Sequence, residues 1–147
     1  MQARVAAEEP WFLAYDIDPA SGADLLQAKL AADEGQGDAV LVSGNPVVGA
    51  ALLRRHLHPA YRGVLQFALS VDPANRRQGV GRALAEAALA EARRLGSRRV
   101  QLAVVESNRP ALALFEAAGF EREGRLRAAA EIDGARHDVI PMAKLLA

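Results

Sequence analysis

Short hydrophobic runs, separated by turn-forming residues, recur along most of this chain. Runs bounded by Gly, Pro, Asn or Asp in this way are typical of β-strands. We therefore expect strands at residues 11–17, 38–42, 47–55, 65–71 and 100–105. The last run is almost entirely apolar, which predicts a strand covered on both faces of its sheet. Ser43-Gly44-Asn45-Pro46 separates the second and third runs and predicts a hairpin.

Two further segments show the hydrophobic spacing of amphipathic helices. The first spans residues 21–34, where Ser21 and Asp24 resemble a capping box and Gly35 ends the helix. The second begins after Gly81 and ends at Gly96, and one face is expected to carry Leu84, Ala87, Ala88, Ala92 and Leu95. The strand, helix, strand, helix order across residues 64–118 makes two parallel strands with a right-handed crossover the default. The expected fold class is α/β, with a mixed central sheet flanked by helices.

Length and composition narrow the picture. A chain of 147 residues suits one domain with a hydrophobic core, and its first ten residues carry no pattern and are expected to be loose. The absence of cysteine excludes a disulfide framework, a thiolate zinc site and a thiol nucleophile, and no metal site is expected. A formal net charge of zero argues against nucleic acid as a partner. No apolar run is long enough to cross a membrane or form a signal peptide, so we expect a cytoplasmic protein.

The segment from Val71 to Arg82, VDPANRRQGVGR, predicts an anion-binding loop between a strand and a helix. Gly79 and Gly81 lack side chains where the backbone would approach a ligand, and the first helical turn offers unpaired N–H groups. These donors, the positive end of the helix dipole and the flanking Arg76, Arg77 and Arg82 favour an anion. The other arginines of the basic stretch up to Arg99 have the alternative of simply filling solvated helix faces.

Two common nucleotide-binding motifs do not fit this loop. A P-loop needs a Lys after its second Gly, and the chain has no Lys between Lys29 and Lys144. A Rossmann turn needs a third small residue where this chain has Leu84, and Arg98 and Arg99 occupy the position of the acidic residue that binds ribose.

Two motifs in sequence carry a resemblance to a known family. The spacing Arg76-x-x-Gly79-x-Gly81 after an apolar strand resembles the first signature of the GNAT superfamily of N-acetyltransferases. Residues 108–120, NRPALALFEAAGF, resemble its second signature, NxxAxxLYExxGF. The tail from Glu123 to Met142 is similar to the closing hairpin of many members. The resemblance covers roughly residues 40–147.

The resemblance implies a single GNAT domain over residues 1–147, with acetyl-CoA as cosubstrate and its pantetheine arm between two splayed parallel strands, 65–71 and 100–105. Backbone amides from Gln78 to Ala83 would hold the pyrophosphate, and the backbone at Val71 would polarise the thioester carbonyl. The cofactor-binding residues expected are Leu69, Ser70, Val71, Arg76, Arg77, Gln78, Gly79, Val80, Gly81, Arg82, Ala83, Asn108 and Phe115. Asn108 is equally an N-cap, and one residue can fill both roles.

The chain departs from the family pattern at two positions that matter for proton transfer. Phe115 stands where many members have a Tyr that protonates the CoA thiolate, and Gln66 stands where a carboxylate is common. Glu106 remains as the candidate general base, in addition to Val71 as oxyanion donor. The alternative for Glu106 is an exposed loop carboxylate.

Other polar residues are weaker candidates. His56 and His58 share one face of an extended segment and more often belong to a surface loop. Glu131, Asp133, His137 and Asp138 fall in the closing hairpin, where acidic side chains would suit a cationic amine, although Asp133-Gly134 is also a turn signature.

Two functions are therefore considered. The first is acetyl transfer to a primary amine, in a protein N-terminus, a lysine or a small molecule, with a homodimer as a possible assembly. The alternative is a non-catalytic module that binds acyl-CoA.

Overall fold

The computed structural model describes residues 39–43, 49–56, 58–71 and 79–146, and the structural statements below concern these residues. The strand and helix expected at residues 11–17 and 21–34 lie outside this part of the chain, as do Arg76, Arg77 and Gln78.

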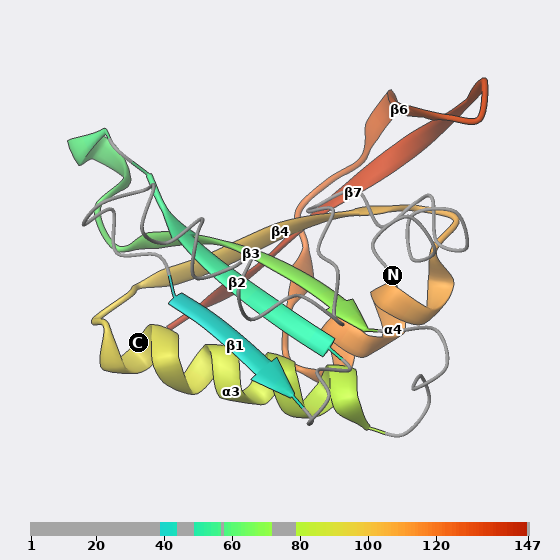
Figure 1. Ribbon diagram of the computed structural model, residues 1–147. Helices are drawn as coiled ribbons and strands as arrows, with labels where there is room; N and C mark the ends of the chain where they lie inside the picture. The colour runs from blue at the N-terminus through green and yellow to red at the C-terminus, as the bar shows by residue number, and fades with distance from the viewer. Residues whose placement is uncertain (1–38, 44–48, 57, 72–78, 147) are drawn as a thin grey trace.

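One mixed sheet forms the centre of the fold (Figure 1). Its strands are β1 (Ala39–Ser43), β2 (Gly49–Arg55), β3 (Val64–Val71), β4 (Arg99–Val105), β5 (Glu121–Arg122), β6 (Leu126–Ile132) and β7 (Ala135–Leu145). The order is β1-β2-β3-β4-β7-β5, and β6 pairs with β7 off this path. β3 and β4 are parallel, whereas the other neighbours are antiparallel. The β1–β2 hairpin and the parallel β3–β4 pair confirm the arrangement that the hydrophobic runs predict.

Two helices cover one face of the sheet, and a short 3-10 helix, η1 (Pro59–Tyr61), precedes β3. In Figure 1, α3 (Val80–Arg94) runs beneath β1, β2 and β3, and α4 (Arg109–Ala117) lies farther along the sheet. Apolar side chains at alternate positions of β3 and β4 meet these helices in one core, because successive strand residues point to opposite faces. Leu65, Phe67 and Leu69 are the contributions of β3.

Three aromatic rings pack together in the core, next to the last paired residues of β3 and β4. The ring centroid of Phe115 lies 5.8 Å from that of Phe67 and 5.7 Å from that of Phe120, both edge to face. Each of these pairs contributes about 0.5–1.5 kcal/mol beyond its buried area. The cluster joins β3 to α4 and to the residue that precedes β5.

The structure corrects three expectations about burial and boundaries. The helix after the loop begins at Val80 rather than after Gly81, because Gly79 adopts the left-handed conformation of a cap. Ala87 is exposed, since the buried face of α3 runs through Ala85, Ala88 and Ala92 and Ala87 falls outside that stripe. Ala103 is also exposed, so β4 is not covered on both faces along its whole length.

The C-terminal strands form an arm that projects from the sheet (Figure 1). β6 and β7 are joined by Asp133 and Gly134, whose φ angles of 52° and 79° are both positive. Two positive φ angles are the signature of a type I′ hairpin turn, so the turn predicted at Asp133-Gly134 is confirmed. The second half of β7 pairs with β4, which anchors the arm beside the parallel strands.

Candidate functional site

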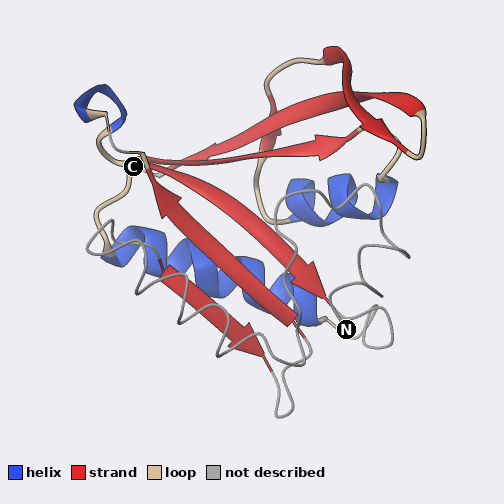
Figure 2. Ribbon diagram, turned by 45° about the horizontal axis from the view of Figure 1, so that its top comes forward, coloured by secondary structure: helices blue, strands red, loops and turns tan. Residues whose placement is uncertain are grey.

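The parallel strands part halfway along their length. β3 and β4 pair only at Val64 with Arg99, Leu65 with Val100 and Gln66 with Gln101. Beyond these positions β3 continues to Val71 and β4 to Val105 without pairing with each other. Figure 2 shows the strands diverging from the end of the sheet marked by the C-terminus. The splayed parallel strands that the resemblance implies are confirmed.

Both strands are held from their outer sides along the gap. β3 pairs with β2 as far as Val71, and β4 pairs with β7 as far as Val105. Backbone groups that point into the gap are therefore fixed in position by the sheet. An edge of this kind is suited to pairing with another extended group.

The N-terminus of α3 lies at the open end of the gap. Gly79 caps the helix with φ +80°, and the first intrahelical bond runs from the N–H of Ala83 to the carbonyl of Gly79 at 3.0 Å. The N–H groups of the first turn have no acceptor within the helix and carry the positive end of its dipole. This end of α3 offers donors to an anion.

Gly81 has a packing role as well. A Cβ at this position would lie 3.3 Å from Cδ2 of Leu114 and 3.7 Å from side-chain atoms of Leu69 and Val71. The missing side chain thus lets the first turn of α3 approach both β3 and α4. Gly81 faces protein side chains here, whereas the predicted close approach was to a ligand.

Gly79→Ala should destabilise the protein by about 1–2 kcal/mol, the usual cost of the left-handed conformation for an L-residue. A Cβ there would meet no atom within 4 Å, so the cost arises from the backbone alone. Chemical denaturation measures it. Gly79→Asn is the matched control and should cost less, because Asn tolerates this conformation better. An alanine variant as stable as the original protein would contradict the assignment of the cap.

Asn108 is buried and caps α4. Its Oδ1 accepts a hydrogen bond from the N–H of Ala111 at 3.3 Å, and Pro110 occupies the first turn. The N-cap alternative is confirmed, since the side chain satisfies one of the unpaired donors of the helix. Asn108 follows β4 by way of Glu106 and Ser107, and its contact with a cofactor stays a prediction.

Gln66 and Phe115, the two departures from the family pattern, both lie close to the origin of the gap. Gln66 Oε1 accepts a hydrogen bond from Gln101 Nε2 at 3.2 Å, at the last paired position of β3 and β4. Phe115 is 3% exposed and packs against Phe67 and Phe120. Neither side chain carries a group that titrates near neutral pH.

Glu106 lies directly after β4, beside β7 of the arm. Its backbone N–H donates to the carbonyl of Asp138 at 2.9 Å, and its Oε2 lies 3.2 Å from Nη2 of Arg125. Its side chain is 40% exposed. Glu106 is therefore a partly exposed carboxylate in an ion pair, at the end of the gap.

Arg125 has a second partner, Asp138, and was not singled out by the sequence. Its Nε donates to Asp138 Oδ2 at 2.6 Å, and the N–H of Ala128 donates to Oδ1 at 2.7 Å. The Ala128 hydrogen bond and then that of Arg125 hold the pKa of Asp138 below its usual range. Asp138, one of the acidic residues predicted to suit a cationic amine, is thus ionised, and its charge is balanced by Arg125 within the arm.

Arg125→Gln should raise the pKa of Asp138 but leave it below the ordinary value, because the Ala128 hydrogen bond is the larger cause of the shift. Because the pKa of Asp138 is lower in the folded than in the unfolded state, the ionised carboxylate stabilises the fold. This contribution is fully present above the unfolded pKa and is lost as pH falls through the folded pKa. Carboxyl ¹³C shifts against pH measure the change. Arg127→Gln, which removes only a longer-range charge, should produce a smaller rise. An unchanged pKa in Arg125→Gln would contradict the contact.

The other predicted polar residues divide between two ends of the molecule. His137 Nδ1 lies 3.3 Å from Ser107 Oγ and so ties the arm to the loop before α4. Asp133 is exposed at the tip of the arm, and Glu131 is exposed near it. His56 and His58 lie beside the start of β3, at the opposite end of that strand from Val71, and are not brought together with Glu106.

Several arginines pair with carboxylates on solvated surfaces. Arg82 pairs with Glu86 at 3.1 Å, and both side chains are 62% exposed. Arg94 pairs with Glu91 on the same helix. Pairs this exposed contribute little to stability, so the alternative of a solvated helix face holds for Arg94.

No cluster of three or more His, Cys, Asp or Glu side chains suited to a metal occurs in the part of the chain that the structure describes. Over the same residues, none of the helices combines the length and the apolar character that crossing a membrane requires.

Comparisons with known proteins agree with this architecture. A family model described as acetyltransferase (GNAT) family matches residues 5–120. The ribosomal protein bS18-alanine N-acetyltransferase of Escherichia coli K12 is 39% identical over 77 residues, which cover 52% of each chain. The curated relatives are matched over between 33% and 52% of their own length.

Two solved structures resemble the chain along nearly its whole length. A GCN5-related N-acetyltransferase from Kribbella flavida has a TM-score of 0.80 at 26% identity, covering 99% of this chain and 88% of that one. A GNAT superfamily phosphinothricin acetyltransferase from Sinorhizobium meliloti, in complex with acetyl-CoA, has a TM-score of 0.76 at 22% identity and covers 99% and 85%. With most of its length matched by the family model, this chain belongs to the acetyltransferase (GNAT) family.

Proposed function

We propose that this protein transfers the acetyl group of acetyl-CoA to a primary amine, by direct attack of the amine on the thioester in a ternary complex. The acceptor is a protein N-terminus, a lysine or a small-molecule amine. A cytoplasmic location and a possible homodimer complete the proposal.

The observation that carries the proposal is the gap between β3 and β4 with the N-terminus of α3 at its open end. Pantetheine contains amide groups, and these would pair with backbone groups of Leu69, Ser70 and Val71 along the edge of β3. The pyrophosphate would lie against the first turn of α3, where N–H donors and the helix dipole favour an anion. The gap and the helix end therefore suit the two chemically distinct parts of one cofactor.

The reaction needs a base for the ammonium, a donor for the oxyanion and a proton for the departing thiolate. Glu106 is our proposed base, and the backbone at Val71 is our proposed oxyanion donor. With Phe115 in place of Tyr, the thiolate leaves without a phenolic acid. A thiol that ionises near pH 8 to 9, about as cysteine does, is a sufficient leaving group.

The names of similar proteins support an amine as the class of acceptor. The Escherichia coli relative acts on the alanine of a ribosomal protein, and the Sinorhizobium meliloti neighbour is a phosphinothricin acetyltransferase. The name of the Escherichia coli relative describes acetylation of an amino group, which is the class we propose for this chain.

A second candidate function is binding of acyl-CoA without catalysis. Phe115 has no ionisable group and is packed in the aromatic cluster, and the amide of Gln66 bonds to Gln101. Phe115 and Gln66 stand at the positions where many family members have an acid or a base.

Release of free CoA thiol separates the two functions. The protein is incubated with acetyl-CoA and a panel of amines that includes phosphinothricin, a peptide with N-terminal alanine, a lysine peptide and small diamines. Catalysis predicts that at least one amine accelerates thiol release above hydrolysis in buffer and yields an acetylated product by mass spectrometry. Acetyl-CoA binding in a calorimeter without acceleration by any amine would favour the binding function.

A further inference from the structure

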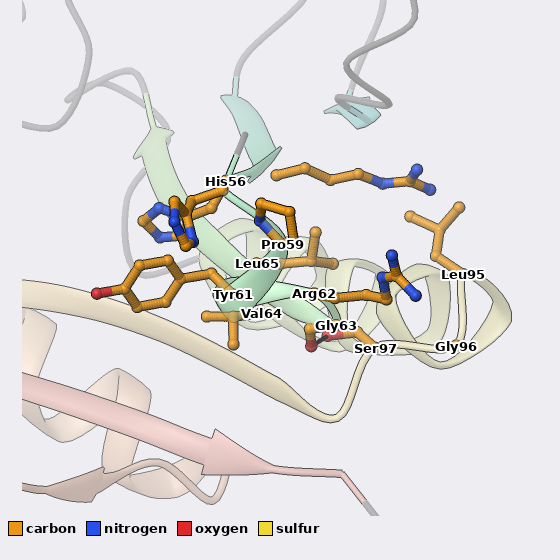
Figure 3. A pocket seen from close by; sticks show the side chains of 12 residues that line it. His56, Pro59, Tyr61, Arg62, Gly63, Val64, Leu65, Leu95, Gly96 and Ser97 are labelled. Carbon is orange, nitrogen blue, oxygen red and sulfur yellow. Dashed lines mark hydrogen bonds between the residues drawn. The ribbon is translucent and has the colours of Figure 1, made fainter.

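A pocket lies far from the gap between β3 and β4. Its volume is about 330 Å³, and it is lined by the end of β2, η1, the start of β3 and the end of α3 (Figure 3). Seven residue steps of β3 separate Val64 in this pocket from Val71, which at about 3.3 Å per residue is roughly 20 Å. The pocket and the proposed acetyl-CoA site are thus two separate places on the molecule.

The polar lining of the pocket is cationic or hydrogen-bond donating. Arg55, Arg62, His56 and His58 contribute to it, and none of its described lining residues is Asp or Glu. His58 Nδ1 accepts a hydrogen bond from the N–H of Ala60 at 3.0 Å. In neutral His58 the proton is therefore on Nε2, which makes that nitrogen a donor. Charge and donors together favour an anion.

The end of α3 does not require the charge of Arg62. In Figure 3 the Arg62 side chain extends toward Leu95 and Gly96. Three carbonyls of the last turn already accept backbone hydrogen bonds: that of Glu91 from Leu95, that of Ala92 from Ser97 and that of Arg93 from Gly96. Arg93 and Arg94 provide further positive charge to the same turn. These carbonyls therefore have hydrogen-bond partners without any contribution from Arg62.

Hydrogen bonds to the carbonyls of Arg62 and Gly63 hold this part of the pocket lining in place. Gly63 O accepts from the N–H of Arg98 at 2.8 Å, from the N–H of Arg99 at 3.2 Å and from Ser97 Oγ at 2.8 Å. Gly63 has φ +82°, and a Cβ there would lie 3.1 Å from Cγ of Arg98. Arg98 Nε also donates to the carbonyl of Arg62 at 3.0 Å. The backbone that bears Arg62 is thus preorganised by the turn after α3.

The remaining walls are apolar or aromatic. Pro59, Val64 and Leu95 line the pocket, and the ring of His56 lies 4.8 Å from that of Tyr61 with an interplanar angle of 32°. A volume of about 330 Å³ is at the lower end of the range for small-molecule sites. This combination suits a ligand whose apolar body is about the size of one ring.

We propose that this pocket binds a small organic anion, consisting of a carboxylate or phosphate head on a ring-sized apolar body. The head contacts the guanidinium of Arg62, and the body contacts Pro59 and Leu95. Nε2 of His58 adds a second donor elsewhere on the lining of the same pocket. The site is independent of the acetyl-CoA site.

The three histidines of the chain provide the test, because His56 and His58 line the pocket and His137 lies in the arm. Phenyl phosphate and benzoate are titrated at pH 7.5 while the ring Hε1 resonances are followed by NMR. Saturable shifts of His56 and His58, with His137 unchanged, are expected with and without saturating acetyl-CoA. Inorganic phosphate and neutral benzamide, each with half of the required chemistry, should bind at least tenfold more weakly.

Arg62→Ala should weaken binding of phenyl phosphate at least tenfold. Arg94→Ala is the matched control, since Arg94 lies nearby but outside the lining and should leave the affinity unchanged. Amide spectra of both variants establish that they are folded. Equal shifts of all three histidines, equal affinity for benzamide or inorganic phosphate, or unchanged affinity in folded Arg62→Ala would overturn the proposal.

Discussion

Glu106→Gln should reduce the rate of acetyl transfer by about 10²- to 10⁴-fold near neutral pH, the usual contribution of a positioned base. The loss should shrink as pH rises, because the free amine then forms without help from the protein. The measurement is kcat/KM against pH with the best amine of the panel. The position of Glu106 at the end of the gap motivates the expectation.

Two controls separate a base from an ion-pair partner. Glu121→Gln makes the same chemical change on the exposed strand β5 and should leave the rate unchanged. Arg125→Gln breaks the contact with Glu106 but keeps its carboxylate. If Arg125→Gln reproduces the loss and its pH dependence, Glu106 acts through the ion pair. A loss in Glu106→Gln that is equal at all pH values would also exclude Glu106 as the base.

Gly81→Asp should weaken acetyl-CoA binding by about 10- to 10³-fold. Like charges a few ångströms apart repel by about 1–4 kcal/mol, depending on how well water screens them, and the pyrophosphate is expected beside this turn. The same carboxylate interacts favourably with the helix dipole, by about 0.3–1 kcal/mol. Because the Cβ of the new residue would lie 3.3 Å from Cδ2 of Leu114, stability is expected to fall as well. Calorimetry and denaturation measure the losses of affinity and of stability separately.

Gly81→Ala isolates the steric part of this effect. Its Cβ meets Leu114 at 3.3 Å but brings no charge, so it should weaken binding far less than the aspartate does. Ala90→Asp changes the net charge equally on an exposed position of α3 and should leave the affinity unchanged. Equal affinity of Gly81→Asp and the original protein would refute the placement of the pyrophosphate.

Features that depend on neighbouring residues could be predicted from the sequence. The cap at Asn108 needs only an Asn before Arg109-Pro110, and the turn at Asp133-Gly134 needs only two residues that accept positive φ. The start of α3 was placed two residues too late, because either Gly79 or Gly81 can adopt a cap conformation and the local sequence does not distinguish them.

Features that depend on register could not be predicted in the same way. The pairing of β6 with β7 shifts between Leu126 and Ala130, where Ala128 has φ +49°. Asp138 therefore receives the Ala128 N–H and the Arg125 guanidinium, a contact that a regular hairpin would not place there. The hydrophobic pattern of the arm carries no sign of this irregularity.

The sequence by itself determined most of the described strands, the helix between the parallel strands and the parallel pair, because hydrophobic periodicity, capping and turn chemistry act between residues close in the chain. Only the tertiary structure decided where β3 and β4 part, which partners Glu106 and Asp138 have, and that His56, Arg62 and Leu95 line one pocket. These depend on segments that are distant in the chain, whose relative positions are set by packing and strand register rather than by local preference.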